Sequence, residues 1–279
     1  MEATISVIQL DSVLGDVEAN LQKISHFVDL AGAQGANFVV FPELGTTGYF
    51  VGDRLADLAE PVPGPTTERL GEMAKRNNLY LLGGMIEKGE GDALHNSLVM
   101  LSPSGELVAS YHKCHMFSVE RNFFTPGSDG VVVDTEFGRV GLTVCYDLVF
   151  PEYIRGLVLQ GARLILNGTD WITDDWQTGM GWSGKVASQM AATRALENGI
   201  HLAMADRTGI EAGWRSLGHS CICAPSGAFL ARIEEGEGIA TATVQLESDE
   251  WDKWREIATY LPDRRVDLYQ RLAGERVAG

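Results

Sequence analysis

The chain has 279 residues, of which 45% are hydrophobic, and it carries a formal net charge of −16. A surface this acidic repels nucleic acid and anionic membranes, so neither is an expected partner. No apolar run approaches the roughly 20 residues that a membrane-spanning helix needs, while the hydrophobic share is enough for the core of one large domain over residues 1–279.

The first half of the chain alternates strands and helices. Residues 4–10 are strand-like, with no basic region or signal-peptide core before them, which favours a cytoplasmic protein. Apolar residues at helical spacing predict a helix over 16–34, which Gly35 ends. The further elements expected here are strand 37–41, helix 66–77, strand 79–86, hairpin 96–101 with 107–112, and hairpin 131–134 with 139–144.

The second half continues the alternation and ends in a polar, aromatic segment. Its expected elements are helix 152–160, strand 163–167, a long loop over 168–182, helix 185–198, and strands 200–205, 219–224, 229–233 and 239–246. Because hairpins interrupt the alternation, the pattern favours a mixed sheet with helices packed outside it. Residues 251–279 are expected to form a C-terminal arm that could dock on a partner subunit.

Cysteine and histidine usage argues against disulfides and metal sites. Four cysteines are too few for a disulfide framework in a chain of this length, and none of them form a Cys-x-x-Cys pair. His112 and His115 flank Lys113, but no carboxylate pattern nearby suggests zinc. We therefore expect no metal ion.

A cysteine follows the apolar run over residues 140–144, and a helix with Pro151 in its first turn begins shortly after it. Backbone N–H groups at such a turn would lower the pKa of the Cys145 thiol and would offer hydrogen bonds to an oxygen that the sulfur attacks. Cys145 is therefore a candidate nucleophile. The alternative is that it is a buried cysteine that only packs in the core.

Glu43 and Lys113 also follow predicted strands, and active sites of α/β sheets gather beyond the carboxyl ends of strands. A carboxylate can take a thiol proton, and an ammonium group can stabilise an oxyanion. Taken singly, a glutamate after a strand is usually a solvated or capping group, and a lysine there usually lies on the surface. Position alone does not join these residues to Cys145.

Three segments are similar to the signature segments of the carbon–nitrogen hydrolase (nitrilase) superfamily, in the same order. They are Phe-Pro-Glu at 41–43, Tyr-His-Lys-Cys-His-Met-Phe at 111–117, and Val-Cys-Tyr-Asp-Leu-Val-Phe-Pro-Glu at 144–152. Segments 119–127, 155–162 and 260–269 also resemble the family, so the similarity covers nearly the whole chain. The resemblance implies an α+β fold, a four-layer αββα sandwich of mixed sheets with outer helices, assembled as a homodimer or a larger homo-oligomer.

The resemblance also implies a cysteine-dependent hydrolase that needs no cofactor. The roles that the resemblance implies are general base and acid for Glu43, oxyanion stabilisation for Lys113, and for Cys145 the nucleophile that forms a thioester. Glu120 matches a second glutamate that orients the triad and the substrate. The alternative for Glu120 is a loop carboxylate paired with Arg121.

The residues after the cysteine favour an amide as the small-molecule substrate. Nitrile-cleaving relatives usually carry Cys-Trp-Glu, whereas Cys145, Tyr146 and Asp147 resemble the amide-cleaving branches, and the backbone N–H of Tyr146 would complete the oxyanion hole. The expected products are a carboxylic acid and ammonia. The alternatives are an N-carbamoyl-amine hydrolase, a true nitrilase, and a non-catalytic binding module of the same fold.

Asp170 and Trp171 stand where relatives commonly carry Asn-Trp, and both are expected near the substrate. Asp206 likewise replaces a common asparagine. These aspartates could create a pocket for a cationic substrate, or they could reflect drift in an acidic protein. Trp171, Trp176 and Trp182 could line an apolar acyl pocket or pack at a subunit interface.

Overall fold

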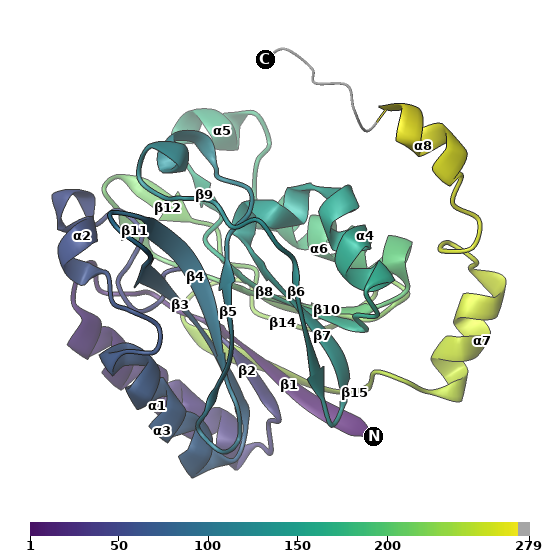
Figure 1. Ribbon diagram of the computed structural model, residues 1–279, viewed down its shortest axis with the longest axis horizontal. Coiled ribbons are helices and arrows are strands. Elements are labelled where there is room, and N and C mark those ends of the chain that lie inside the picture. Colours follow the sequence, from purple (N-terminus) through teal and green to yellow (C-terminus); the bar gives the residue numbers. More distant parts are fainter. Residues whose placement is uncertain (273–279) are drawn as a thin grey trace.

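Two six-stranded sheets pack face to face, and helices cover their outer faces (Figure 1). This arrangement is seen in a computed structural model that describes residues 1–272. The expected α+β class and the four-layer αββα sandwich are confirmed. No helix among the described residues combines the length and the apolar character that crossing a bilayer requires.

The first sheet has three parallel strands at its centre and antiparallel strands at its edges. Its strands, in spatial order, are β15 (Gly238–Gln245), β1 (Glu2–Gln9), β2 (Phe38–Val40), β3 (Tyr80–Lys88), β4 (Leu94–Leu101) and β5 (Leu107–His112). Helices α1 (Val17–Ala33) and α3 (Pro65–Asn77) pack side by side on its outer face (Figure 1).

The second sheet repeats this plan. Its strands, in spatial order, are β14 (Phe229–Arg232), β13 (Cys221–Cys223), β10 (His201–Asp206), β8 (Leu164–Thr169), β7 (Gly138–Val144) and β6 (Val131–Thr135). Strands β7, β8 and β10 are parallel, and α4 (Pro151–Leu159) and α6 (Gly184–Asn198) form the outer layer.

The remaining elements are short. They are a small sheet of β9 (Ile172–Thr173), β11 (Ile210–Glu211) and β12 (Trp214–Ser216), the helices α2 (Leu55–Leu58), α5 (Asp175–Gly179), α7 (Asp249–Ile257) and α8 (Val266–Leu272), and the 3-10 turns η1 (Gly52–Arg54), η2 (Ser118–Asn122) and η3 (Cys145–Val149). The expected loop 168–182 therefore contains β9 and α5. Both are too short for a periodic pattern to reveal them.

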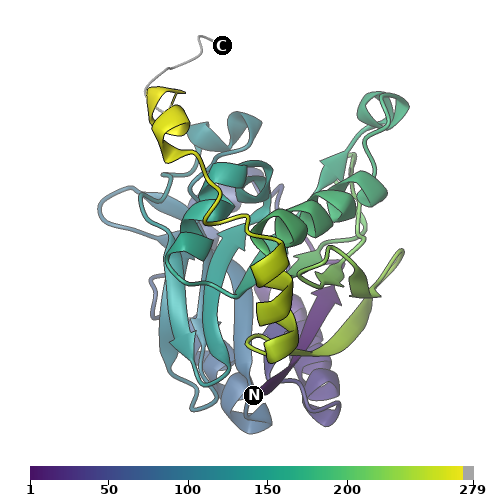
Figure 2. The same ribbon diagram turned by 90° about the vertical axis from the view of Figure 1, so that its right-hand side faces the viewer.

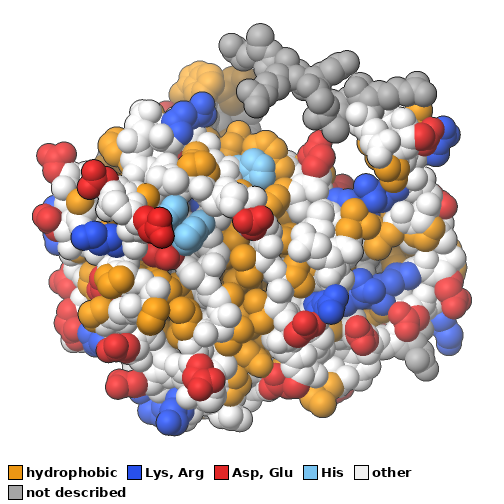
Figure 3. Space-filling view, viewed as in Figure 1, with side chains coloured by type: hydrophobic (Ala, Val, Ile, Leu, Met, Phe, Trp, Pro, Cys, Tyr) orange, Lys and Arg blue, Asp and Glu red, His pale blue; other side chains and the backbone are white. Residues whose placement is uncertain are grey.

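The central strands bury both of their faces. In β1, Ile5 and Val7 point into the core between the two sheets, whereas Ile8 points into the layer that also contains Ile24 of α1. Such strands often read as continuous apolar runs, as β2 does, whereas polar residues such as Ser6 interrupt the apolar residues of β1. Figure 3 shows that hydrophobic side chains also reach the surface in a band between β5 and β6, among scattered charged groups.

The two sheets approach each other closely at Gly168 of β8. A Cβ atom at Gly168 would lie 2.8 Å from the carbonyl oxygen of Phe41 and 3.3 Å from the backbone nitrogen of Glu43. Glycine is therefore required at this position. The contact brings the end of β2 beside the ends of β7 and β8, so residues that follow strands of different sheets share one space.

The C-terminal segment forms α7 and α8 along one side of the sandwich, beyond α4 and α6 (Figures 1 and 2). The ring of Trp251 in α7 packs edge-on against His201 at 5.5 Å, and Arg255 donates a hydrogen bond to the carbonyl of Gly199. The last part of the expected arm, 273–279, lies outside the described residues. The single-domain boundary, the docking of this arm on a partner and the homo-oligomer stay predictions.

Candidate active site

A buried lysine joins two buried glutamates at the ends of the first sheet's strands. The Nζ atom of Lys113, after β5, lies 2.7 Å from Oε1 of Glu43, after β2, and 2.8 Å from Oε1 of Glu120, in η2. The side chains of Glu43 and Lys113 are 0% exposed. Neither residue is therefore the solvated surface group that its position in the sequence would ordinarily suggest.

The carboxylate of Glu43 is held by three donors. Asn96 of β4 donates its amide N–H to Oε1 at 2.6 Å, beside the Lys113 ammonium group. The backbone N–H of Asp170 donates to Oε2 at 3.1 Å. Burial raises the pKa of Glu43 to about 7, although Lys113 opposes the rise. A pKa near neutrality suits a group that accepts a proton and later returns it.

Glu120 faces the interior rather than its sequence neighbour. Its Oε1 accepts a hydrogen bond from the Tyr49 hydroxyl at 2.6 Å, and its Oε2 accepts one from the backbone N–H of Phe117 at 2.7 Å. Arg121 instead donates to the carbonyl of Ser118, so the loop pairing of Glu120 with Arg121 is not formed. Sequence reasoning missed Tyr49 and Asn96, because neither belongs to a motif that points to this chemistry.

Cys145 lies at a strained turn where β7 ends and η3 begins. Its φ of 44° falls in the left-handed region, which costs a non-glycine residue free energy and often marks a functional site. Leu44, directly after Glu43, has a φ of 47°, and Ser118, at the start of η2, has one of 48°. Three segments that build the site therefore hold strained backbone.

The Cys145 thiol is neutral when the site is at rest. Burial raises its pKa well above the ordinary value, and the carboxylate of Glu43 adds to the rise, while Lys113 opposes it. The prediction of a lowered thiol pKa is therefore wrong, because the sulfur is buried beside carboxylates. A neutral thiol needs a base before it can attack. The Sγ atom lies 3.7 Å from the carbonyl oxygen of Asp170, whose N–H donates to the Glu43 carboxylate.

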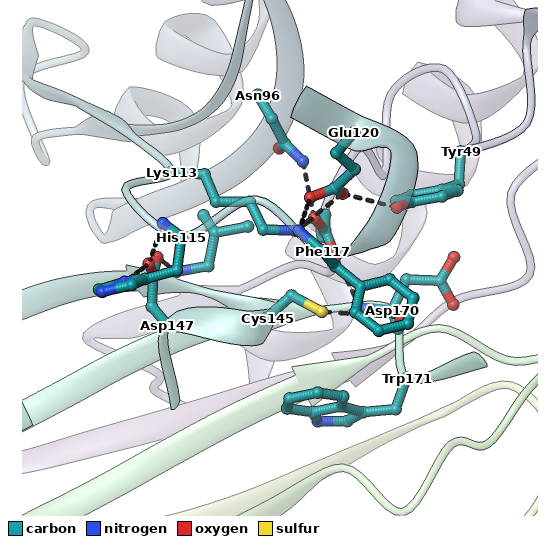
Figure 4. Close-up of polar contacts among 12 residues, drawn as sticks. Tyr49, Asn96, Lys113, His115, Phe117, Glu120, Cys145, Asp147, Asp170 and Trp171 are labelled. Atoms are coloured by element: carbon teal, nitrogen blue, oxygen red, sulfur yellow. Dashed lines mark hydrogen bonds and ion pairs between the residues drawn. The ribbon is translucent and has the colours of Figure 1, made fainter. Parts of the chain in front are cut away.

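Asp147 ties the cysteine turn to the lysine segment. Its buried carboxylate accepts hydrogen bonds from the backbone N–H of Val144 at 3.0 Å, the Tyr111 hydroxyl at 2.6 Å, and the backbone N–H of His115 at 2.9 Å. The ring Nδ1 of His115 lies 2.8 Å from the same carboxylate (Figure 4). Tyr146 is in the first turn of η3, where backbone N–H groups have no acceptor within the turn.

The carboxylate of Asp170 is paired with a buried arginine. Its Oδ2 lies 3.2 Å from Nη1 of Arg207, and Nη2 of Arg207 also pairs with Glu211. Glu211 in turn accepts hydrogen bonds from the backbone N–H groups of Tyr49 and Phe50. This network gives the cationic-pocket interpretation of Asp170 no support. Asp206 also faces inward, and it accepts a hydrogen bond from the backbone N–H of Trp171 at 3.0 Å.

A cavity of about 250 Å³ opens onto Cys145. Tyr146, Asp170 and Trp171 line it, so the three predicted substrate-binding residues lie around the thiol. Trp182 forms part of the wall as well, whereas Trp176 is 72% exposed on the outside of α5. Figure 4 shows the side chains of Lys113 and Cys145 extending toward the same space, with Phe117 and Trp171 beside it.

This arrangement places a buried base of near-neutral pKa and a buried cation close to a thiol that lines a cavity. Such a set can deliver a nucleophile to an electrophilic carbon, stabilise negative charge on its oxygen, and move one proton between sulfur and a leaving group. Within residues 1–272 no group of three or more histidine, cysteine or carboxylate side chains has the geometry to hold a metal ion.

Comparison with known proteins connects this site to a family. A family model described as carbon-nitrogen hydrolase matches residues 4–256. A probable nitrilase of Schizosaccharomyces pombe is 34% identical, over 98% of this chain and 99% of that protein. An omega-amidase of Homo sapiens is 30% identical, over 94% of each. The solved amidase from Nesterenkonia sp. AN1 is 27% identical, with a TM-score of 0.84 over 97% of this chain and 99% of that one.

Proposed function

The chain belongs to the carbon–nitrogen hydrolase family and is an amidase-type enzyme that acts on non-peptide carbon–nitrogen bonds, and we propose that it hydrolyses a small primary amide through a thioester on Cys145. The observation that carries the proposal is a buried thiol in the lining of a cavity, close to the buried ion pair of Glu43 and Lys113. Another structure of the Nesterenkonia amidase records acrylamide added to its active-site cysteine, which supports the same role for Cys145.

In the first half of the reaction Glu43 takes the proton from Cys145 as the sulfur attacks the amide carbon. The carbonyl electron pair moves to oxygen, where Lys113 and the backbone N–H of Tyr146 stabilise the negative charge. When the tetrahedral intermediate collapses, the carbon–nitrogen bond breaks and Glu43 gives its proton to the nitrogen. Ammonia leaves and the acyl group remains on sulfur.

In the second half water replaces ammonia. Glu43 takes a proton from the water molecule as its oxygen attacks the thioester carbon. Collapse of the second tetrahedral intermediate breaks the carbon–sulfur bond, and Glu43 returns the proton to the sulfur. One amide and one water are converted to one carboxylic acid and one ammonia, and Cys145 is regenerated as a thiol.

The thioester is testable by rapid quenching. We expect intact-mass spectrometry of acid-quenched enzyme to show one acyl adduct, located on Cys145, and we expect hydroxylamine to intercept it as a hydroxamate. Primary amides, N-carbamoyl amines and nitriles should be compared with ammonia and acid both quantified. Absence of both adduct and hydroxamate during turnover would contradict the thioester, and faster turnover of nitriles than of amides would contradict the choice of an amide.

We expect kcat/KM to show an acid limb with an apparent pKa near 7. The pKa of Glu43 is raised to about 7, so the carboxylate becomes protonated as the pH falls through this value. Protonated Glu43 cannot accept the thiol proton, and kcat/KM then decreases about tenfold for each further pH unit. A kcat/KM that stays level from pH 8 to pH 5 would contradict this role.

A further inference from the structure

The cavity at Cys145 has a largely apolar wall, in which the polar atoms of Trp182, Trp171 and Tyr49 already have partners. The indole N–H of Trp182 donates to the carbonyl of Ile172 at 3.0 Å, and that of Trp171 points to the sulfur of Met204 at 3.4 Å. The Tyr49 hydroxyl donates to Glu120. These aromatic side chains therefore present carbon surface, rather than free hydrogen-bond donors, to whatever occupies the cavity.

The rings of Trp171 and Trp182 also pack against each other. Their rings meet edge to face at 5.8 Å with an interplanar angle of 81°, which is a favourable geometry for an aromatic pair. Val149, the last residue of η3, and Met180, directly after α5, add to the apolar lining. The wall is thus preformed in shape, as is typical of pockets that bind a small apolar group.

Among the described residues that line the cavity, none is a lysine or arginine. Asp170 is the one aspartate or glutamate in the lining, and Arg207 holds its carboxylate. Arg207 is itself buried, with Asp170 and Glu211 as its partners, and Lys113 lies between two glutamates. An acyl group that carried a carboxylate would lose its hydration here without gaining a counter-charge.

We infer that the acyl group of the substrate is uncharged and apolar, of a size up to a phenyl-bearing acid, and that the enzyme discriminates against monoamides of dicarboxylic acids. This inference rests on the proposed amide hydrolysis. The cavity of about 250 Å³ exceeds the roughly 150 Å³ that encloses one benzene molecule, so a phenyl ring with a short linker fits. Selectivity follows from the chemistry of the wall, since the reacting groups treat all primary amides alike.

Valeramide and glutaramate test the inference, because they differ only in a methyl group that a carboxylate replaces. We expect kcat/KM for valeramide and for phenylacetamide to exceed that for glutaramate by at least about 100-fold. Equal kcat/KM for valeramide and glutaramate would overturn the inference while leaving amide hydrolysis intact.

A matched pair of arginine substitutions, one in α5 and one directly after it, tests whether the cavity wall causes the selectivity. Met180, which follows α5, lines the cavity and is 73% exposed, whereas Trp176, within α5 and 72% exposed, does not line it. Met180→Arg should raise the glutaramate-to-valeramide ratio of kcat/KM at least about tenfold, because it supplies the missing counter-charge. Trp176→Arg should leave the ratio unchanged, and an equal rise in both variants would contradict the role of the wall.

Measurements of binding affinity distinguish a failure of this inference from a failure of the proposed function. In the Cys145→Ala protein, quenching of tryptophan fluorescence should report binding of phenylacetamide and valeramide, with glutaramate binding at least about tenfold more weakly. If no amide is hydrolysed but this order of affinities holds, the proposed reaction fails and the inference about the pocket stands. If glutaramate binds as tightly as valeramide, the inference fails whatever the turnover.

Discussion

Replacing Cys145 with alanine is expected to lower kcat/KM for amide hydrolysis by a factor on the order of 10⁴ to 10⁶, the range measured when members of a comparable triad are removed. The substitution deletes the atom that bonds to the acyl group, so the thioester adduct should also disappear. Only one sulfur is lost from a nearly buried side chain at a strained turn, so the protein should remain folded. Steady-state kinetics with ammonia quantified, together with circular dichroism, would check both expectations.

The control for this experiment is another buried cysteine. Cys223 lies in β13, is fully buried, and pairs across the sheet with Leu202 of β10. Cys223→Ala removes the same atom from a position outside the cavity lining and should retain near-normal kcat/KM. Comparable losses in the two variants would show a general disturbance of the fold, and near-normal turnover by Cys145→Ala would refute the nucleophile.

Lys113→Ala is expected to affect both turnover and stability. Loss of an oxyanion donor should lower kcat by at least about 100-fold. The same change leaves the carboxylates of Glu43 and Glu120 buried without their counter-charge, so the free energy of unfolding near pH 8 should fall by about 3–5 kcal/mol. Burial disfavours the charged form of Lys113, but Glu43 and the other anionic groups around the lysine hold the pKa of Lys113 well above the ordinary value. The lysine of the wild-type protein is therefore charged between pH 5 and pH 8.

The stability effect of Lys113→Ala should depend on pH with a defined sign. Without the lysine the pKa of Glu43, which burial already raises, rises further above its unfolded value, so protonation of Glu43 favours the folded variant. The stability deficit should therefore shrink as the pH falls from 8 toward 5, which urea unfolding at both pH values would measure. A deficit that grows on acidification would contradict the charge network.

Lys113→Arg separates the two roles. The arginine keeps the positive charge, so it should recover much of the stability that alanine loses. It should not recover kcat, because a planar guanidinium fork does not replace a compact ammonium group at the same point. Recovery of both quantities would mean that the position needs only a charge.

Sequence reasoning found the residues that follow strands, and it missed those that reach the site from within strands or from loops. Glu43, Lys113 and Cys145 could be located because apolar runs mark strand ends, and the resemblance to a family joined them. Asn96 and Tyr49 contact the two glutamates only through strand register and loop conformation, which are set by contacts far apart in the chain.

The thiol pKa illustrates a different limit. A cysteine at the start of a helical turn suggests a lowered value, but burial and the neighbouring carboxylate reverse the sign. Burial depends on how the two sheets pack and is not visible in a local pattern. The same reason prevented the sequence from showing that Trp182 faces the cavity while Trp176 faces outward.

The close approach of the sheets at Gly168 means that substitutions in the sheets and substitutions in the cavity wall have different consequences. The positions of the reacting groups depend on how far apart the two sheets lie, so substitutions in the buried layers of either sheet would disturb them. Much of the cavity wall, by contrast, comes from the short stretch 170–182. Substitutions within this one short segment can therefore change which acyl group is accepted while the reaction itself stays the same.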